Sequence, residues 1–324
     1  MYRPAIKTGT GAAGIDKSWA QLIGTAIDFR LRLAFTTANL VPLTAQGGYG
    51  ALARRHLDAA HLLTGLTEAT KAVLAAAGLI GSTGIELPGR SEDDLIRLCV
   101  VAGQLDQLYR KYESVVRTTP LLDGDTVATL EQAIAQVPSR VVDDLHDQVT
   151  RANDGLGPLR ASATKVTAGL EFAGSHLIGA DADLLVDGLL LDIKAKNEAT
   201  TIKKPEVYQL AGYVLLDFDD IHRIEQVGIY WTRHGVMRTF SVPVFFELLG
   251  ATAPIDELRG RLRDELSSYA RQAGHAPHAE LRQPAEPDQQ QDEPDQPVVI
   301  EQLPAPEDTR LGRSVRWLRG VLRR

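Results

Sequence analysis

The sequence contains one cysteine, Cys99, among 324 residues, and this scarcity excludes several classes of protein. A single thiol cannot build a disulfide framework, a four-cysteine zinc site or a cysteine-ligated iron–sulfur cluster. No run approaches the roughly 20 continuous apolar residues that cross a bilayer. The opening residues, MYRPAIKTGTGAAG, lack the apolar core of a signal peptide. These absences predict a protein of the reducing cytoplasm.

The sequence has fewer basic than acidic residues, 35 Lys and Arg against 42 Asp and Glu, so the formal net charge is -7 at pH 7. This balance argues against a surface coated in lysine and arginine, but it allows one local basic groove for nucleic acid. The P-loop and GxSxG motifs are missing. Residues 9–14, GTGAAG, spell GxGxxG, but no core strand precedes them as dinucleotide binding requires.

Apolar residues recur at helical spacing through the first half of the chain. They predict helices over about residues 18–35, 50–77, 126–136 and 138–153. A further helix is expected to open at Ser91 as its N-cap, with Asp93 and Asp94 in its first turn. The first half is therefore predicted to be all helix.

The pattern changes near residue 164, where glycines separate the short β-rich runs TKVTAGLEFAG, ADADLLVDG and LLLDIKAK. These runs predict consecutive antiparallel strands, followed by a helix from Pro205 to Asp217. VGIYWTRHG and VMRTFSV then predict a strand pair, and a helix follows from Pro254 to Ala273. The predicted fold class is α/β, with a mixed central sheet and a large helical N-terminal part.

The domain organisation follows from these elements. Residues 1–274 are expected to form a single globular domain, with a helical part at 1–160 and a core at 164–273. Residues 275–309 are rich in Pro, Gln, Asp and Glu and predict a disordered linker. Residues 310–324 form a basic amphipathic tail that would suit DNA, a membrane surface or an acidic partner, or would remain a solvated end.

The stretch GADADLLVDGLLLDIKAK, residues 179–196, carries the candidate chemistry. Because side chains alternate along a strand, Asp192 and Lys194 should project to the same side, and a turn at residues 187–188 can bring Asp183 near them. The two carboxylates and the Ile193 carbonyl would offer hard oxygen ligands to Mg²⁺ or Mn²⁺, while Lys194 orients a water. The alternative is a surface hairpin with solvated charges.

The spacing Asp183…Asp192-Ile193-Lys194 resembles the signature of the PD-(D/E)xK phosphodiesterase superfamily. Gln209 and Tyr213 resemble the QxxxY motif of its RecB-like branch. Residues 24–28, GTAID, are similar to the GxxxH motif of that branch, with Asp28 in place of the usual histidine. The longer run from residue 174 to 235 also resembles a bacterial group within the branch.

This resemblance implies a restriction-endonuclease-like core and a nuclease that uses Mg²⁺ or Mn²⁺ on DNA rather than RNA, in repair or anti-phage defence. It implies Asp183, Asp192 and Asp28 as metal ligands. It also implies Lys194 as the catalytic lysine, with Gln209 and Tyr213 ordering the site.

Several alternatives stay open. Asp28 could instead pair with Arg30 or Arg32, and Asp181 competes with Asp183 for the first ligand position. The nuclease fold could also serve as a catalytically inactive binding or regulatory module. A third carboxylate could come from Asp143, Asp144, Asp147 or Glu171, and phosphates could be contacted by Lys196, Lys203 and Lys204, which could equally be ordinary surface lysines.

Overall fold

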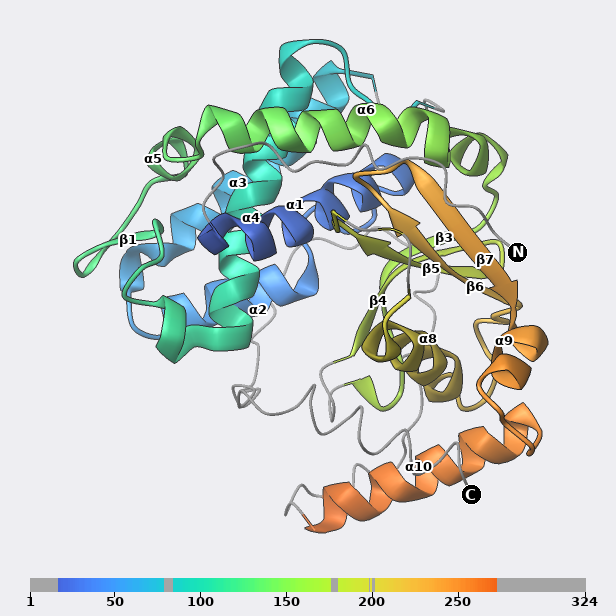
Figure 1. Ribbon diagram of the computed structural model, residues 1–324. Coiled ribbons are helices and arrows are strands. Elements are labelled where there is room, and N and C mark those ends of the chain that lie inside the picture. The colour runs from blue at the N-terminus through green and yellow to red at the C-terminus, as the bar shows by residue number, and fades with distance from the viewer. Residues whose placement is uncertain (1–16, 79–83, 176–179, 198, 200–201, 273–324) are drawn as a thin grey trace, which may run out of the picture.

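A computed structural model describes residues 17–78, 84–175, 180–197, 199 and 202–272 of the chain (Figure 1). The glycine-rich run at residues 9–14, the linker and the basic tail lie outside the described residues. The predicted single domain and its boundaries therefore remain predictions.

A five-stranded mixed sheet forms the second half of the chain. Its strands occur in the spatial order β3-β4-β5-β6-β7. β5 and β6 are parallel, and the other neighbouring pairs are antiparallel. The strands are β3 (Val166–Glu171), β4 (Asp181–Val186), β5 (Leu189–Lys194), β6 (Gln226–Trp231) and β7 (Val236–Ser241). The expected mixed α/β class and the consecutive antiparallel strands are confirmed.

Helix α8 (Lys204–Leu216) connects the parallel pair β5 and β6, as a crossover between parallel strands requires. The remaining elements are α1 (Lys17–Phe35), α2 (Leu43–Ala53), η1 (Leu57–Ala59), α3 (Ala60–Ala76), α4 (Arg90–Val115), β1 (Leu122–Asp123), β2 (Thr126–Val127), α5 (Leu130–Ala135), α6 (Ser139–Ser162), α9 (Val242–Leu248) and α10 (Ile255–Gln272).

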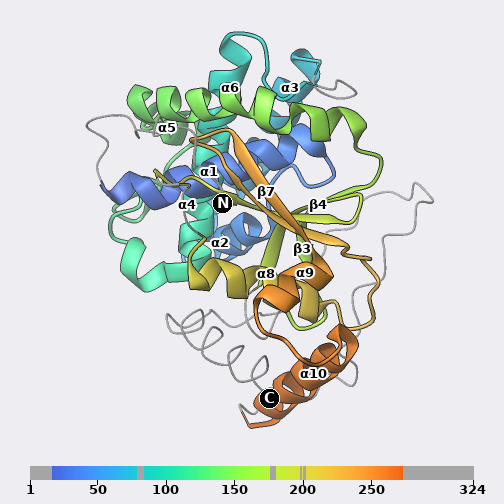
Figure 2. The same ribbon diagram turned by 45° about the vertical axis from the view of Figure 1, so that its right-hand side comes forward.

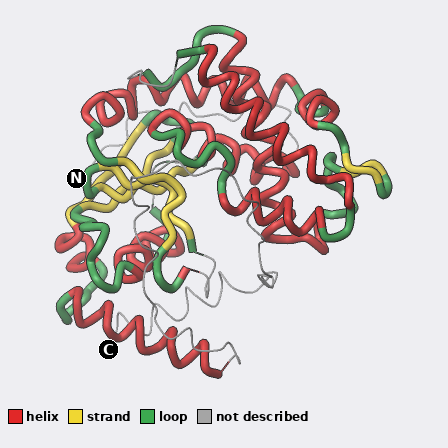
Figure 3. Tube along the Cα trace, turned by 180° about the vertical axis from the view of Figure 1, so that it is seen from behind, coloured by secondary structure: helices red, strands yellow, loops and turns green. Residues whose placement is uncertain are grey.

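The sheet buries apolar side chains on both faces. Leu184 and Leu191 join a large core with α1, α3, α4 and α6, whereas Leu185 and Leu190 join a second core with α8, α9 and α10. Figures 1 and 2 show these two groups of helices on opposite sides of the strands. The view from behind in Figure 3 shows the strands beside the N-terminal helices. Burial on both faces explains why the strands read as nearly continuous apolar runs.

The predicted glycine turn closes the hairpin between β4 and β5. Asp187 and Gly188 have φ angles of 46° and 82°, the positive values that a tight hairpin turn needs. The Asp187 carboxylate also accepts hydrogen bonds from the backbone N–H groups of Thr164 (3.0 Å) and Lys165 (2.7 Å). The turn is thereby tied to the beginning of β3, which fixes the register of three strands.

Three predictions for the helical half are wrong in detail. The helix expected over residues 50–77 is interrupted, because His56 adopts an extended conformation and lies with its Nδ1 3.0 Å from the carbonyl oxygen of Asp125. Ser91 is not an N-cap, since the chain enters α4 through Gly89 at φ 53°, a conformation suited to glycine. The start of the helix expected at 126–136 forms β2 instead, and α5 begins at Leu130.

One contact in this half predicts a pH-dependent stability. His146 on α6 lies between two carboxylates, with Nδ1 2.8 Å from Asp93 and Nε2 3.0 Å from Glu86. Because carboxylates only accept, both ring nitrogens carry protons in this arrangement. Burial alone would lower the pKa of His146, but the hydrogen bonds to Asp93 and Glu86 raise it above its ordinary value of 6.5.

Since the pKa is raised in the folded state, the stabilisation is fully present below pH 6.5 and is lost as pH rises through the folded-state pKa. We expect the melting temperature of the wild type to fall over this pH range because the stabilisation is lost, and we expect that of His146→Gln not to show this fall. Thermal melts of both proteins across that range check it, and a variant that declines in parallel with the wild type would contradict the assignment.

Candidate active site

The two central antiparallel strands separate at Asp183. The register between β4 and β5 runs from Val186↔Leu189 only as far as Leu184↔Leu191. Beyond it, the Ile193 backbone N–H donates to Asp183 Oδ2 at 2.7 Å. The Asp183 carboxylate therefore takes the place of the backbone carbonyl group that would normally accept this hydrogen bond in a sheet. It lies directly beside the segment that carries Asp192 and Lys194.

Asp192 and Lys194 form an ion pair on the face of β5 that points toward α8. Asp192 has no exposed surface. Lys194 Nζ lies 2.8 Å from each carboxylate oxygen and donates a hydrogen bond to Oδ1. The Lys194 side chain keeps 23% of its surface exposed, so the pair joins a buried carboxylate to an accessible ammonium group.

Helix α8 holds this lysine in place. Gln209 Oε1 accepts from Lys194 Nζ at 3.2 Å, and Gln209 Nε2 donates to the Tyr213 hydroxyl at 2.7 Å. The hydroxyl in turn donates to the Asp181 carbonyl at 2.6 Å. Residues four apart share one helix face, so the QxxxY spacing builds a continuous hydrogen-bond chain from β5 to β4.

Helix α1 contributes Asp28 and Arg32, one turn apart. Arg32 Nε donates to Asp28 Oδ1 at 2.8 Å. Arg32 Nη2 lies 2.5 Å from Asp28 Oδ2, 2.8 Å from Asp183 Oδ1 and 3.8 Å from Asp181 Oδ2. Three carboxylates thus gather around a single guanidinium nitrogen. Arg30, the other partner considered for Asp28, is bonded to Glu92 instead.

The cluster carries more carboxylates than cations. Asp28, Asp181, Asp183 and Asp192 are set against Arg32, Lys194 and Arg110, and Arg110 also pairs with Asp106. Burial, reinforced by the charges of Asp183 and Asp181 against the pull of Arg32, raises the pKa of Asp28 to about 8. Burial also raises the pKa of Asp192 to about 6, with Asp183 adding to the rise and Lys194 opposing it. The cluster therefore favours an additional positive charge.

The carboxylates of Asp28, Asp183 and Asp192 are of the chemical type that binds a divalent cation, but their arrangement is not a preformed metal site. Asp192 Oδ2 is buried and accepts no hydrogen bond from the described part of the chain, although it lies in the Lys194 ion pair. Carboxylate oxygens are the ligands that Mg²⁺ and Mn²⁺ prefer. Within the same part of the chain, no three acidic, histidine or cysteine side chains converge as a metal cage. Arg32 lies between Asp28 and Asp183, where such a cage would close.

Three of the four candidates for a third carboxylate lie on α6, and the fourth ends β3. Asp143 and Asp147 are exposed on α6, and Asp144 lies in a buried ion pair on that helix. Glu171 is the candidate at the cluster, because it pairs in register with Asp181 across β3 and β4. Burial, then the charge of Asp181, raises its pKa.

The lysines proposed to contact nucleic acid lie around the beginning of α8. Lys196 forms an ion pair with Glu206 in the first turn of that helix. Lys203 and Lys204 are exposed. The last two therefore face solvent on the side of the sheet to which Lys194 projects.

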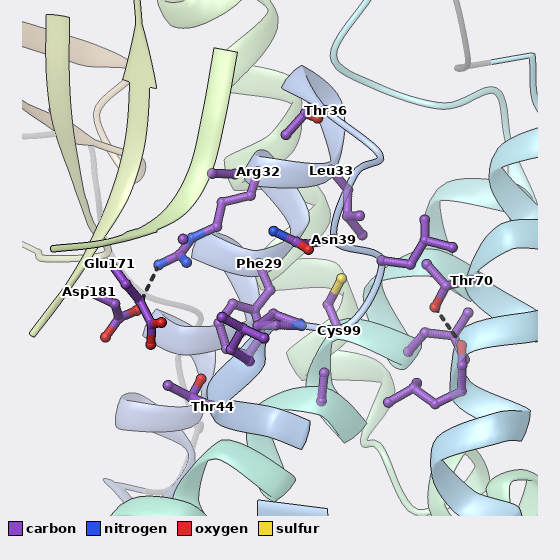
Figure 4. A pocket seen from close by; sticks show the side chains of 18 residues that line it. Phe29, Arg32, Leu33, Thr36, Asn39, Thr44, Thr70, Cys99, Glu171 and Asp181 are labelled. Carbon is purple, nitrogen blue, oxygen red and sulfur yellow. Dashed lines mark hydrogen bonds and ion pairs between the residues drawn. The ribbon is translucent and has the colours of Figure 1, made fainter. Parts of the chain in front are cut away.

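A largely apolar pocket lies on the other side of Arg32. Figure 4 shows Phe29, Leu33 and Cys99 within it and Arg32, Glu171 and Asp181 gathered at one end. Burial raises the pKa of the Cys99 thiol to about 12, so this cysteine is an apolar wall rather than a nucleophile. The pocket borders the carboxylate cluster through Arg32, Glu171 and Asp181.

Sequence reasoning names Arg32 only as a possible partner of Asp28 and misses Arg110 altogether. Arg32 follows Asp28 by four residues, and Arg110 follows Asp106 by four residues on α4. Such Asp–Arg spacing on one helix face was a readable signal for local ion pairs. No local pattern indicates that Arg32 and Arg110 also reach Asp183 and Asp181 of β4.

Three comparisons with known proteins, against family models, curated proteins and solved structures, each found no match. In addition, the helices in the described ranges include none with the length and apolar character of a membrane span.

Proposed function

We propose that this protein is a metal-dependent phosphodiesterase that cleaves DNA. The observation that supports this function is the convergence of Asp183, Asp192 and Lys194 where β4 and β5 separate. The order α1, β3, β4, β5, α8, β6, with β5 and β6 parallel, agrees with the proposed PD-(D/E)xK core. The resemblance adds the preference for DNA and a setting in repair or anti-phage defence in the cytoplasm.

In this mechanism, Asp183 and Asp192 would hold Mg²⁺ or Mn²⁺, with Asp28 as a further acidic group. The bound ion would supply an acidified water and neutralise charge on the scissile phosphate. Lys194 donates hydrogen bonds toward the attacking water and the phosphate oxygens, and Gln209 keeps its ammonium group aimed at the site. Tyr213 anchors Gln209 to β4.

The test is degradation of single- and double-stranded DNA by the purified protein with Mn²⁺ or Mg²⁺. Chelation should stop the reaction. Lys194→Ala should lower the rate by about 10²–10⁴-fold, the range for losing a positioned proton-transfer group. The variant is purified in parallel, so equal degradation by both proteins would identify a contaminant and remove the nuclease proposal.

Arg32 favours a second candidate, an inactive nuclease fold that serves as a binding or regulatory module. Its guanidinium already neutralises Asp28 and Asp183, the groups that metal would need. Titration with Mn²⁺ separates the two functions. A nuclease binds Mn²⁺ in a way that depends on Asp192, whereas an inactive scaffold shows no such binding and no cleavage.

A further inference from the structure

Arg110 contacts the carboxylate cluster through Asp181, and its side chain is partly exposed. Its Nε donates to Asp106 Oδ1 and Oδ2 at 3.0 and 3.1 Å, and its Nη2 donates to Asp181 Oδ1 at 3.2 Å. Nη1 makes no hydrogen bond with the described residues. The side chain is 35% exposed, whereas Asp106 is buried. Two carboxylates therefore hold the guanidinium through Nε and Nη2, and Nη1 is the nitrogen that they leave unused.

Exposure separates the three cationic side chains of the cluster. Arg32 is 8% exposed, and its Nε and Nη2 are engaged by carboxylates. Lys194 is 23% exposed and is committed to Asp192 and Gln209. Arg110 is the most accessible of the three. A phosphate that approaches from solvent therefore meets Arg110 before it meets Arg32.

The position of Arg110 along α4 is also unusual. The next residue, Lys111, leaves the helical conformation, with φ -147° and ψ 43°. Helix α4 therefore breaks immediately after Arg110, and Lys111 is exposed at the break. Lys111 donates to Gln21 on α1 at 3.4 Å, so Arg110 is the basic side chain at this break that contacts the cluster.

We propose that Arg110 binds a backbone phosphate of the nucleic acid next to the scissile phosphate. This inference rests on the proposed nuclease function and adds a substrate-binding residue to it. A cluster rich in carboxylates repels a polyanion, so a nuclease built on it needs fixed cations at its rim. A guanidinium already oriented by Asp106 and Asp181 loses little conformational freedom when its remaining N–H donors bind phosphate.

The experiment compares Arg110→Gln with a matched control, Arg261→Gln. Arg261 lies on α10, is 33% exposed, and pairs with Glu257 four residues earlier, as Arg110 does with Asp106. Binding of a fluorescent single-stranded oligonucleotide is measured across salt concentrations, and cleavage with Mn²⁺ gives KM and kcat. We expect Arg110→Gln to weaken binding by about 10-fold, the scale of a charge-assisted hydrogen bond.

The slope of log affinity against log salt should fall by about 0.7, the value for one lost phosphate contact on a single strand. KM should rise while kcat stays within about twofold. Arg110→Lys keeps the charge, so it should retain the salt slope with intermediate affinity. That variant also protects the test if Arg110→Gln fails to fold because Asp106 loses its partner.

Several results would overturn the proposal. If the wild type cleaves DNA but Arg110→Gln behaves like Arg261→Gln, Arg110 does not bind substrate and the nuclease function still stands. A lower kcat with an unchanged salt slope would mean that Arg110 acts through the carboxylates instead. If the wild type neither binds nor cleaves nucleic acid, both proposals fail.

Discussion

Asp192→Asn is expected to lose at least about 100-fold in Mn²⁺ affinity and to lose DNA cleavage with it. Replacing residues that only support a metal ligand typically costs 10–100-fold in affinity, so removing a direct ligand should cost at least as much. Asparagine keeps the shape of the side chain but removes the charge that attracts the ion. Calorimetric titration with Mn²⁺ measures the affinity.

The same substitution should not lower the melting temperature. Asp192 is fully buried, and burial raises its pKa to about 6, so its charge is held at a cost in stability. Lys194 keeps Gln209 as a partner and has access to solvent. Asp147→Asn, on the exposed face of α6, is the matched control and should leave Mn²⁺ binding unchanged. Retained metal affinity in Asp192→Asn would remove Asp192 from the ligand set.

Glu92→Ala should produce the largest loss of stability, about 3–5 kcal/mol. Glu92 is fully buried and accepts from Arg30 Nε and Nη2, each at 2.6 Å, and from the Leu87 backbone N–H at 2.8 Å. Its removal leaves the Arg30 guanidinium in an apolar core without a counter-ion. Urea denaturation of the variant measures the change in unfolding free energy.

Two further variants make this prediction specific. Asp94→Ala breaks the exposed Arg90–Asp94 pair on the same helix and should cost less than about 1 kcal/mol. Arg30→Met combined with Glu92→Leu removes both buried charges and should recover most of the loss. If the double variant is no more stable than Glu92→Ala, the damage comes from packing and not from an unpaired charge.

The sheet could be predicted from the sequence because its signals are local. The short β-rich runs, the Asp187–Gly188 turn and Pro205 at the beginning of α8 each act within a few residues. The break near His56 could not be predicted, because the partner of that histidine is the carbonyl group of Asp125, 69 residues away. Local pattern fails where a distant contact decides the conformation.

The candidate site also has a part that the sequence predicts and a part that depends on distant contacts. Asp183, Asp192, Lys194, Gln209 and Tyr213 could be proposed together because their order and spacing resemble a known signature. In the structure, hydrogen bonds link the side chains of Asp192, Lys194, Gln209 and Tyr213, and Asp183 accepts from the Ile193 backbone N–H beside them. For Asp28, the sequence analysis leaves two possible partners, Arg30 and Arg32. Helical spacing favours Arg32, four residues from Asp28, over Arg30, which is two residues away. The further contact of Arg32 with Asp183 depends on how α1 packs against β4, and only the folded structure supplies it.

The two cores on opposite faces of one sheet have a practical consequence for dissecting this molecule. A fragment that begins at β3 would expose Leu184, Val186, Leu191 and Ile193 to water and would also forfeit Arg32. The segment that carries Asp183, Asp192 and Lys194 therefore cannot be separated from the N-terminal helices. Both halves must be made on one polypeptide, or co-expressed as complementary pieces, before any assay of the site has meaning.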